Sequence, residues 1–298
     1  MRGRSVDITS VIDGFIIKDA SGSSQVLWEH PSAIVLNLGA TPRIKNCIFL
    51  NNSNASLNFS SSSPQLFNCT FENNSYGQIL NNSIPKFTNC IFKNNFNNIG
   101  NVSPYYGGAL LIKNSNPIFD SCIFLKNKAN DFGGAIANFN SNPIISNCKF
   151  LGNDVPHNYS TSEDGRASDI YNNNSSPIVT NTLFSDSIVR SSAGSIENVN
   201  NSNGSFTNCI FRNCRAFYYG GVCLNDSSSP LFKNCAFLDS KALGGAIIYN
   251  KNHSNSILIN CIANVGSFYN DNSNPIFLNS TFANTTFNSY NNSIVTIT

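Results

Sequence analysis

The sequence predicts an all-β fold: a single-stranded right-handed parallel β-helix of about ten stacked coils, with residues 1–298 forming one domain. Two recurring motifs predict it. The dipeptide Asn-Cys, with Ser-Cys, Asn-Thr and Asn-Ser as variants, returns at spacings of 19 to 34 residues. A Gly-Gly-Ala-Ile type motif falls between several of these copies. A unit this short cannot enclose a core of its own, so each copy must bury its apolar face on its neighbours, as in a solenoid.

The residues around each Asn-Cys copy keep a fixed register. Most copies have Pro five residues before the Cys slot, all have an apolar residue three before it, and all but one have Phe two after it. The Cys slot is filled by Cys47, Cys69, Cys90, Cys122, Cys148, Thr182, Cys209, Cys235, Cys261 and Ser280. Residues two apart share one face of a strand, so the Cys and Phe slots are expected to point inward together.

An asparagine follows the Phe slot by three residues in the early copies, at Asn52, Asn74, Asn95, Asn127 and Asn153. This position falls at a corner of the coil, where the chain turns into the next strand. Buried amides need hydrogen-bond partners, and stacked asparagines supply them to each other. The spacing therefore predicts an asparagine ladder along the axis of the solenoid.

The cysteines have two possible roles. Ten Cys in an extracellular chain suggest disulfides, and neighbouring strands about 4.8 Å apart lie within disulfide range. However, Thr182 and Ser280 replace Cys at the same slot, which favours reduced thiols acting as small core residues. Cys214 and Cys223 are also expected in the core. The sequence has no Cys-x-x-Cys pair and no Cys/His cluster, so we predict no metal site and no cofactor.

Composition excludes several classes of protein. Charged residues make up 11% of the chain and the net charge is +2, which argues against binding to nucleic acid or to an anionic membrane. No stretch approaches the roughly 20 apolar residues of a membrane span. The N-terminus shows no apolar segment typical of a signal peptide. His30 and His253 are isolated and are expected in solvated turns.

The repeats resemble a known family of surface proteins. Gly-Gly-Ala-Ile at 133–136 and 244–247, combined with Phe-x-x-Asn, looks like the repeats of the chlamydial polymorphic outer membrane proteins. More broadly, the chain resembles right-handed β-helix proteins of the pectin-lyase-like superfamily, and Val11–Ile17 is similar to an early coil of its bacterial members. The resemblance implies an adhesive domain at the cell surface or outside the cell. It also raises the alternative of an enzyme acting on polysaccharides.

The longest insertion, between Asn153 and Ile170, carries most of the candidate polar binding residues. It contains Asp154, His157, Glu163, Asp164 and Asp169, and Asp131 lies at the corresponding turn one coil earlier. Such groups suit a cation or a sugar, and the competing interpretation is a solvated surface loop in which Asp169 is only a variant of the repeat. No strand position carries acids in two consecutive coils, so we assign no catalytic residue.

Two pairs of tyrosines are the other binding candidates. Tyr105 and Tyr106 precede one Gly-Gly motif, and Tyr218 and Tyr219 precede another. Exposed tyrosines stack on sugar rings, and the alternative is that one Tyr of each pair packs inward.

We therefore predict a non-catalytic surface protein, adhesin-like or a structural scaffold, whose loops bind a polysaccharide or a cell-surface glycan. The alternative is a polysaccharide lyase or glycoside hydrolase with its chemistry near residues 153–170. Ice binding would need regular outward Thr, which the coils lack. Both ends of the chain fall within a coil, so we also expect either a segment of a longer protein or ends that pair with another chain.

Overall fold

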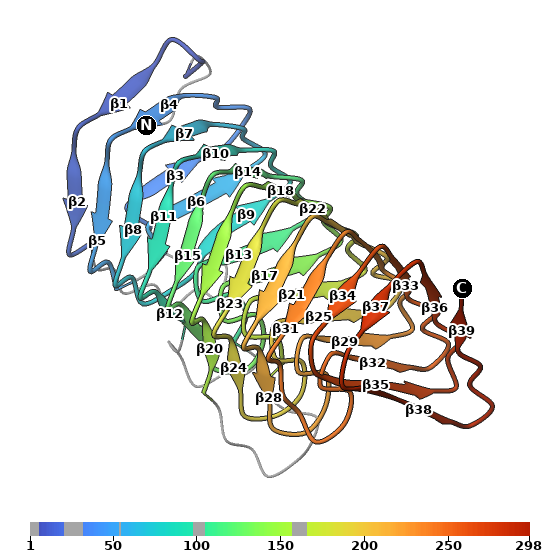
Figure 1. The fold of residues 1–298 in the computed structure, drawn as a ribbon. Coiled ribbons are helices and arrows are strands. Elements are labelled where there is room, and N and C mark those ends of the chain that lie inside the picture. Colours follow the sequence, from blue (N-terminus) through green and yellow to red (C-terminus); the bar gives the residue numbers. More distant parts are fainter. Residues whose placement is uncertain (1–5, 21–31, 54, 98–104, 157–165) are drawn as a thin grey trace.

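The computed structural model describes residues 6–20, 32–53, 55–97, 105–156 and 166–298. These residues form strands and turns, and no helix occurs among them. Figure 1 shows the coils stacked along one axis, from the N-terminal coil in blue to the C-terminal coil in red. The predicted parallel β-helix is confirmed.

The strands of the described residues form four parallel sheets, which we call A, B, C and D. In each of the middle coils the chain passes through sheet A, then B, then D, then C. Sheet A contains β1 (Val11–Asp13), β4 (Arg43–Lys45), β7 (Gln65–Phe67), β10 (Lys86–Thr88), β14 (Ile118–Asp120), β18 (Ile144–Ser146), β22 (Ile178–Thr180), β26 (Ser205–Thr207), β30 (Leu231–Lys233), β33 (Ile257–Ile259), β36 (Ile276–Leu278) and β39 (Thr296–Ile297). Sheet B contains β2 (Ile16–Lys18), β5 (Ile48–Leu50), β8 (Thr70–Glu72), β11 (Ile91–Lys93), β15 (Ile123–Leu125), β19 (Lys149–Leu151), β23 (Leu183–Ser185), β27 (Ile210–Arg212), β31 (Ala236–Leu238), β34 (Ile262–Ala263) and β37 (Thr281–Phe282).

Sheet D is short and covers only the middle coils. It contains β12 (Phe96–Asn97), β16 (Lys128–Ala129), β20 (Asp154–Val155), β24 (Ile188–Val189) and β28 (Arg215–Ala216). Sheet C contains β3 (Ile34–Leu36), β6 (Leu57–Ser60), β9 (Gln78–Asn81), β13 (Leu110–Lys113), β17 (Ile136–Phe139), β21 (Ile170–Asn173), β25 (Ile196–Val199), β29 (Cys223–Asp226), β32 (Ile248–Lys251), β35 (Gly266–Asp271) and β38 (Thr285–Tyr290).

The solenoid is slightly longer than the Asn-Cys copies indicate. Within the described residues sheet A has 12 strands, whereas the sequence repeat indicates about ten coils. The additional strands are β1 and β39, which stack on β4 and β36 at the two ends. The coil of β1 turns at Gly14, where most later coils place Asn and one places Ser121, so the Asn-Cys pattern is absent from it.

The abundant asparagines have a backbone role at the corners. Between sheets A and B, one residue in each coil adopts the left-handed conformation, for example Asn68 at φ 52° and Asn147 at φ 56°. Asn adopts this conformation more readily than other residues with a Cβ atom, because its short polar side chain bonds locally. These side chains also bond from coil to coil, as from Asn208 Nδ2 to Asn181 Oδ1 at 3.1 Å.

The Gly-Gly motif marks a corner at which backbones approach closely. Gly133 has φ +64°, and a Cβ atom on Gly134 would lie 2.4 Å from the carbonyl oxygen of Ser168 in the next coil. A side chain at Gly134 therefore does not fit without displacing backbone, which accounts for the recurrence of glycine there.

The core is a set of side-chain columns that run along the axis. In sheet B the Phe slot forms an unbroken stack from Phe49 to Phe237, with neighbouring ring centroids 4.5 to 5.4 Å apart. In sheet A, Phe87 stacks on Phe119 at 5.0 Å. The predicted inward direction of the Phe, Cys and apolar slots is confirmed by their burial.

The predicted asparagine ladder is also confirmed. Asn52, Asn74, Asn95, Asn127 and Asn153 are buried, and the Nδ2 of each of the first four bonds to the Oδ1 of the next at 2.9 to 3.1 Å. Each Oδ1 also accepts the backbone N–H of the preceding ladder residue, as Asn127 does from Asn95. The ladder therefore satisfies polar groups at a corner that is closed to water.

Asn127→Ala is expected to lower the free energy of unfolding by about 2 kcal/mol, because two buried donors of Asn95 lose their acceptor. Asn127→Ser is the matched control and should cost less, since Ser187 fills the same slot two coils later. Urea unfolding followed by circular dichroism measures both. Equal losses for the two variants would contradict the ladder as the source of stability.

Two further ladders were not predicted from the sequence. Inside sheet C, the residues Asn138, Asn172, Asn198, Asn225, Asn250 and Asn270 are joined by amide bonds of 2.8 to 3.0 Å. They take the slot that holds Ile112 in an earlier coil. At the corner after sheet C, a serine hydroxyl of each coil accepts the backbone N–H of the serine in the preceding coil, as Ser228 does from Ser202 at 3.0 Å.

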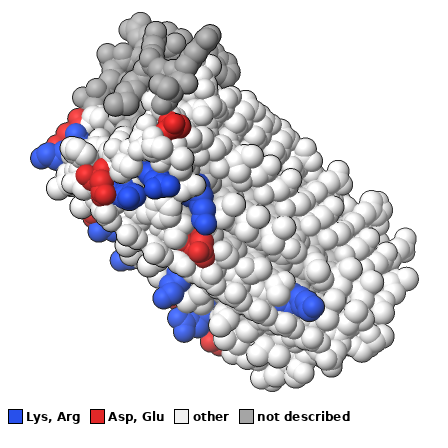
Figure 2. Space-filling model, turned by 90° about the horizontal axis from the view of Figure 1, so that it is seen from above, with Lys and Arg blue, Asp and Glu red and all other residues white. Residues whose placement is uncertain are grey.

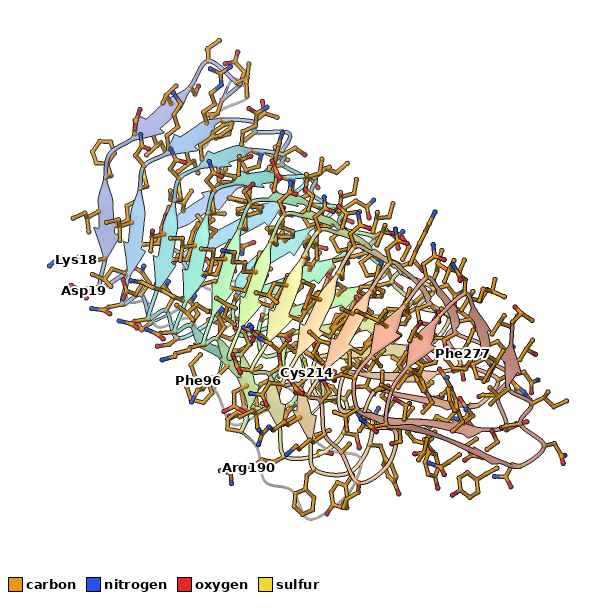
Figure 3. The ribbon with its side chains drawn as sticks, viewed as in Figure 1. Lys18, Asp19, Phe96, Arg190, Cys214 and Phe277 are labelled. Carbon is orange, nitrogen blue, oxygen red and sulfur yellow. The ribbon has the colours of Figure 1, made fainter. Side chains whose placement is uncertain are left out.

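All ten cysteines are buried and free in the structure. Those in the Cys slot line up along the axis, and Thr182 continues this column by accepting the backbone N–H of Cys148 at 3.4 Å. In Figure 3, Cys214 lies within the solenoid, while Lys18 and Arg190 project outward from its edge. Cys214 and Cys223 are both 0% exposed, which confirms that they lie in the core.

Candidate functional site

The described acids near the long insertion have different surroundings in the structure. Asp154 lies on β20, where burial raises the pKa of its carboxyl, and its Oδ2 is 3.8 Å from Lys128 Nζ. Asp131 is buried, and its Oδ2 accepts the backbone N–H of Tyr105 at 2.6 Å. His157, Glu163 and Asp164 lie outside the described residues.

Asp169 lies inside the solenoid rather than in a surface loop. Its carboxylate is 0% exposed and accepts hydrogen bonds from Asn153 Nδ2 at 2.9 Å and from Ser195 Oγ at 2.7 Å. Ser187 Oγ also donates to it. Burial raises the pKa of Asp169 to about 6, and the three hydrogen bonds oppose that rise. Asp169 therefore ends the asparagine ladder, at the coil where Ser187 replaces Asn.

One member of each tyrosine pair packs onto the outer face of sheet C. The Tyr106 ring lies 5.2 Å from Phe132 and 4.8 Å from Phe139. The Tyr219 ring lies 5.0 Å from Tyr249. Tyr105 and Tyr218 are half-buried beside them. The loops before the Gly-Gly motif thus fold back over sheet C and form a second apolar layer outside the main core.

Toward the C-terminal coils this layer becomes a partly exposed row of tyrosines. Tyr249 and Tyr269 occupy the same slot of β32 and β35 and lie 5.3 Å apart. Tyr269 stacks on Tyr290 of β38 at 4.6 Å, and Tyr290 is 46% exposed. We call Tyr219, Tyr249, Tyr269 and Tyr290 the tyrosine face. It runs along the axis, because its members come from successive coils.

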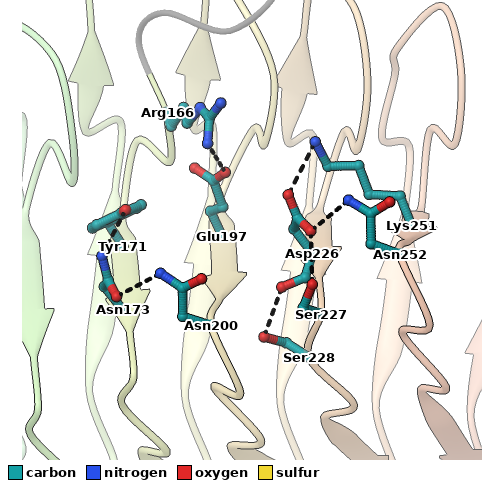
Figure 4. Close-up of polar contacts among 10 residues, drawn as sticks. All are labelled: Arg166, Tyr171, Asn173, Glu197, Asn200, Asp226, Ser227, Ser228, Lys251 and Asn252. Atoms are coloured by element: carbon teal, nitrogen blue, oxygen red, sulfur yellow. Dashed lines mark hydrogen bonds and ion pairs between the residues drawn. The ribbon is translucent and has the colours of Figure 1, made fainter.

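Polar groups border the tyrosine face at the end of the same strands (Figure 4). Lys251 Nζ lies 3.1 Å from Asp226 Oδ2, and Asn252 Nδ2 donates to Asp226 Oδ1 at 2.8 Å. Burial raises the pKa of Asp226, but the bonds from Asn252 and Lys251 outweigh it and hold this pKa below its usual value. In the following coil, Asp271 accepts a hydrogen bond from Asn291.

Arg166 and Glu197 form an ion pair on the coils that precede the tyrosine face. Arg166 Nη1 lies 3.1 Å from Glu197 Oε1, and the Glu197 side chain is 0% exposed while that of Arg166 is 21% exposed. Burial raises the pKa of Glu197 to about 7, although Arg166 acts in the opposite direction. Glu197 Oε2 is buried without a hydrogen-bond partner. A carboxyl in this setting costs stability when it ionises.

The sequence reasoning missed Glu197, Asp226, Lys251 and the later tyrosines. A signal was present, since Glu197 and Tyr249 stand in the slot that holds Leu111 and Ala137 in earlier coils. Only the structure shows that this slot faces outward and that loops cover it. Among the described residues, no group of three or more His, Cys, Asp or Glu is placed to hold a metal ion.

Comparison with known proteins identifies the family. A family model described as "Right handed beta helix region" matches residues 13–183, which is more than half of the chain. The chain belongs to this family. The match establishes the right-handed winding of the β-helix and covers the copies of the repeat from Cys47 to Thr182. The tyrosine face of this β-helix lies beyond the matched residues.

A search of curated proteins and a search of solved structures found no match to the chain. Across the ranges that the structure describes, no helix is long and apolar enough to cross a membrane.

Proposed function

We propose that this β-helix is a non-catalytic, adhesin-like surface protein that binds glycans along the outer face of sheet C. The observation that carries the proposal is the tyrosine face with its border of Asp226, Lys251 and Asn252. Aromatic rings offer an apolar platform that the C–H faces of sugars cover, and nearby carboxylates and amides bond to hydroxyl groups.

The rigidity of the support favours binding. Tyr249, Tyr269 and Tyr290 stand on β32, β35 and β38, which pair in parallel with one another. A ligand that binds such strands does not need to order the backbone, so less binding energy is lost to conformational entropy. The resemblance of the repeats to the polymorphic outer membrane proteins supports a location at the cell surface.

The enzyme alternative receives less support from the geometry. Glu197 has a raised pKa and Asp226 a lowered pKa, which is the pattern of a general acid beside an ionised carboxylate. However, the Glu197 side chain is 0% exposed and Arg166 holds its Oε1. A general acid must come within hydrogen-bond reach of the substrate. The buried carboxyl of Glu197 is not accessible to a substrate.

Tyr249→Ala is expected to weaken glycan binding at least about tenfold, because Tyr249 contacts both Tyr219 and Tyr269 and its removal interrupts the face. Ile144→Ala is the matched control, since Ile144 is an exposed apolar side chain on the outer face of sheet A. A glycan array followed by isothermal titration calorimetry measures the effect. Equal affinity of Tyr249→Ala and the unmodified protein would contradict the proposal, as would release of new reducing ends from a bound polysaccharide.

A further inference from the structure

The tyrosine face is elongated along the solenoid axis, and this constrains the orientation of a bound ligand. Ring centroids are 5.0 Å apart from Tyr219 to Tyr249, 5.3 Å from Tyr249 to Tyr269 and 4.6 Å from Tyr269 to Tyr290. Tyr219 also lies 6.3 Å from Tyr269, so its ring sits beside the row rather than at its end. Tyr249, Tyr269 and Tyr290 come from successive coils, and this run spans about 10 Å parallel to the axis. An extended chain laid along the axis contacts the three rings of this run, whereas a chain laid across the coils contacts only one of them and Tyr219.

The charges beside the row are matched within the protein. Lys251 is paired with Asp226, and Arg166 is paired with Glu197, each at 3.1 Å. Asp271 adds a further carboxylate at the last residue of β35, in register with Lys251 at the end of β32. Among the described side chains on the outer slots of sheet C from β21 to β38, the carboxylates therefore outnumber the cations.

The face drawn in Figure 2 carries few charged side chains. On the face drawn in Figure 2, the Lys, Arg, Asp and Glu side chains gather toward one edge, and most of the remaining surface carries other residues. An anionic polymer on the tyrosine face would meet Asp226 and Asp271 and would have to compete with these carboxylates for Lys251. Like charges placed together in an interface are strongly unfavourable.

The groups that remain beside the rings accept and donate hydrogen bonds without a net positive charge. Asp226 and Asp271 accept, Asn252 both accepts and donates, and the tyrosine hydroxyls do the same. A hydroxyl-rich ligand matches this set, since each hydroxyl can donate to a carboxylate and accept from an amide. Glu197, buried and lacking a partner for Oε2, adds no positive charge to this part of the sheet.

We infer that the ligand of the tyrosine face is a neutral glycan that lies along the solenoid axis. The inference rests on the proposed glycan binding and narrows it to one substrate class and one orientation. It excludes uronic-acid polymers as ligands of this face.

Affinity electrophoresis and calorimetry with defined polysaccharides test the inference. The neutral probes are a β-glucan, a mannan and a xylan, and the acidic probes are polygalacturonate and alginate. We expect at least one neutral polymer to bind with an affinity that changes little between low and high salt, because no ion pair forms with it. Its oligosaccharides should bind more tightly with length until they reach about 10 Å, and then level off.

A charge variant tests the substrate class independently. Asp271→Lys should weaken binding of the neutral polymer about tenfold and create measurable, salt-sensitive binding of polygalacturonate. Asp239→Lys is the matched control, because Asp239 lies at the corner after sheet B, where Lys126 fills the same left-handed position in another coil. It should leave both affinities unchanged.

The outcomes separate the inference from the function on which it rests. If acidic polymers bind and neutral ones do not, and Tyr249→Ala abolishes that binding, glycan binding stands and the neutral class is wrong. If affinity does not rise with the length of the oligosaccharide, the axial orientation is wrong. If no probe binds, both the inference and the proposed function fail.

Discussion

Phe124→Ala is expected to lower the free energy of unfolding by about 3–5 kcal/mol. The ring is 0% exposed and stacks on Phe92 at 5.0 Å and on Phe150 at 4.5 Å. It also meets the edge of Phe119 at 5.7 Å. Removing it leaves a cavity in the middle of the stack, and the paired strands on either side prevent the neighbouring rings from closing it. Urea unfolding at equilibrium measures the loss.

Cys122→Ser, two residues before Phe124, is the matched control. Cys122 is also 0% exposed, but Ser280 fills the same slot in another coil, so a hydroxyl is compatible with this position. A serine there can bond to the carbonyl oxygen of Asp120, as Thr182 Oγ1 does to that of Thr180 at 2.9 Å. We expect a small loss. A larger loss for Cys122→Ser than for Phe124→Ala would contradict the assigned packing.

Raising the pH from about 4 to about 7 is expected to destabilise the protein. Asp169 has a pKa of about 6 when folded against 3.8 for the free side chain, and Glu197 about 7 against 4.5. Between the two values the folded state binds more protons than the unfolded state, so stability falls as pH rises. For each of the two carboxyls, the difference between its folded and unfolded pKa corresponds to a loss of about 3 kcal/mol of folding stability once the pH exceeds both of these values.

Asp169→Asn isolates this contribution. The amide oxygen can still accept from Asn153, and the hydroxyls of Ser187 and Ser195 can turn to accept instead of donate. We expect the variant to be about 1–3 kcal/mol more stable than the unmodified protein at pH 7.5, with no gain near pH 4. Urea unfolding at a series of pH values measures the difference.

Asp186→Asn is the control for the pH series. Hydrogen bonds from Asn213 and Ser185 hold the pKa of Asp186 below its usual value, so the sign of its contribution is opposite. Its stabilisation is present above about pH 4 and is lost as the pH falls through the lowered pKa. The Asp169 interpretation fails if Asp169→Asn loses stability at pH 7.5 or leaves the slope between pH 4 and 7 unchanged.

The fold was predictable because the repeat constrains residues that point inward. Phe124, Cys122 and Asn127 each belong to a column whose members recur at one slot, so a single sequence contains many copies of the same evidence. The ladder of Asn138 and its neighbours was missed, since these residues follow the Gly-Gly motif in only part of the chain and replace Ile112 and Leu80 of earlier coils.

The candidate site was less predictable because it depends on outward residues. Tyr219 and Tyr249 are 30 residues apart, and their contact follows from a loop that folds back over sheet C. No local pattern specifies that loop path. Asp169 illustrates the opposite problem, since its place beside other acids in the sequence suggested a surface cluster. The backbone register of β21 instead turns its carboxylate into the core.

Because the ladders repeat once per coil, the length of this protein is a multiple of the rise of one coil. Each coil presents the same serine, asparagine and phenylalanine slots to the coil above and the coil below, so a whole coil is interchangeable with its neighbour at the level of backbone bonding. Duplication or loss of one coil would change the length of the rod by about 4.8 Å and leave its cross-section intact. In such a molecule, the length of a row of binding residues equals the number of coils that contribute a residue to it times the rise per coil. This length therefore changes in discrete steps.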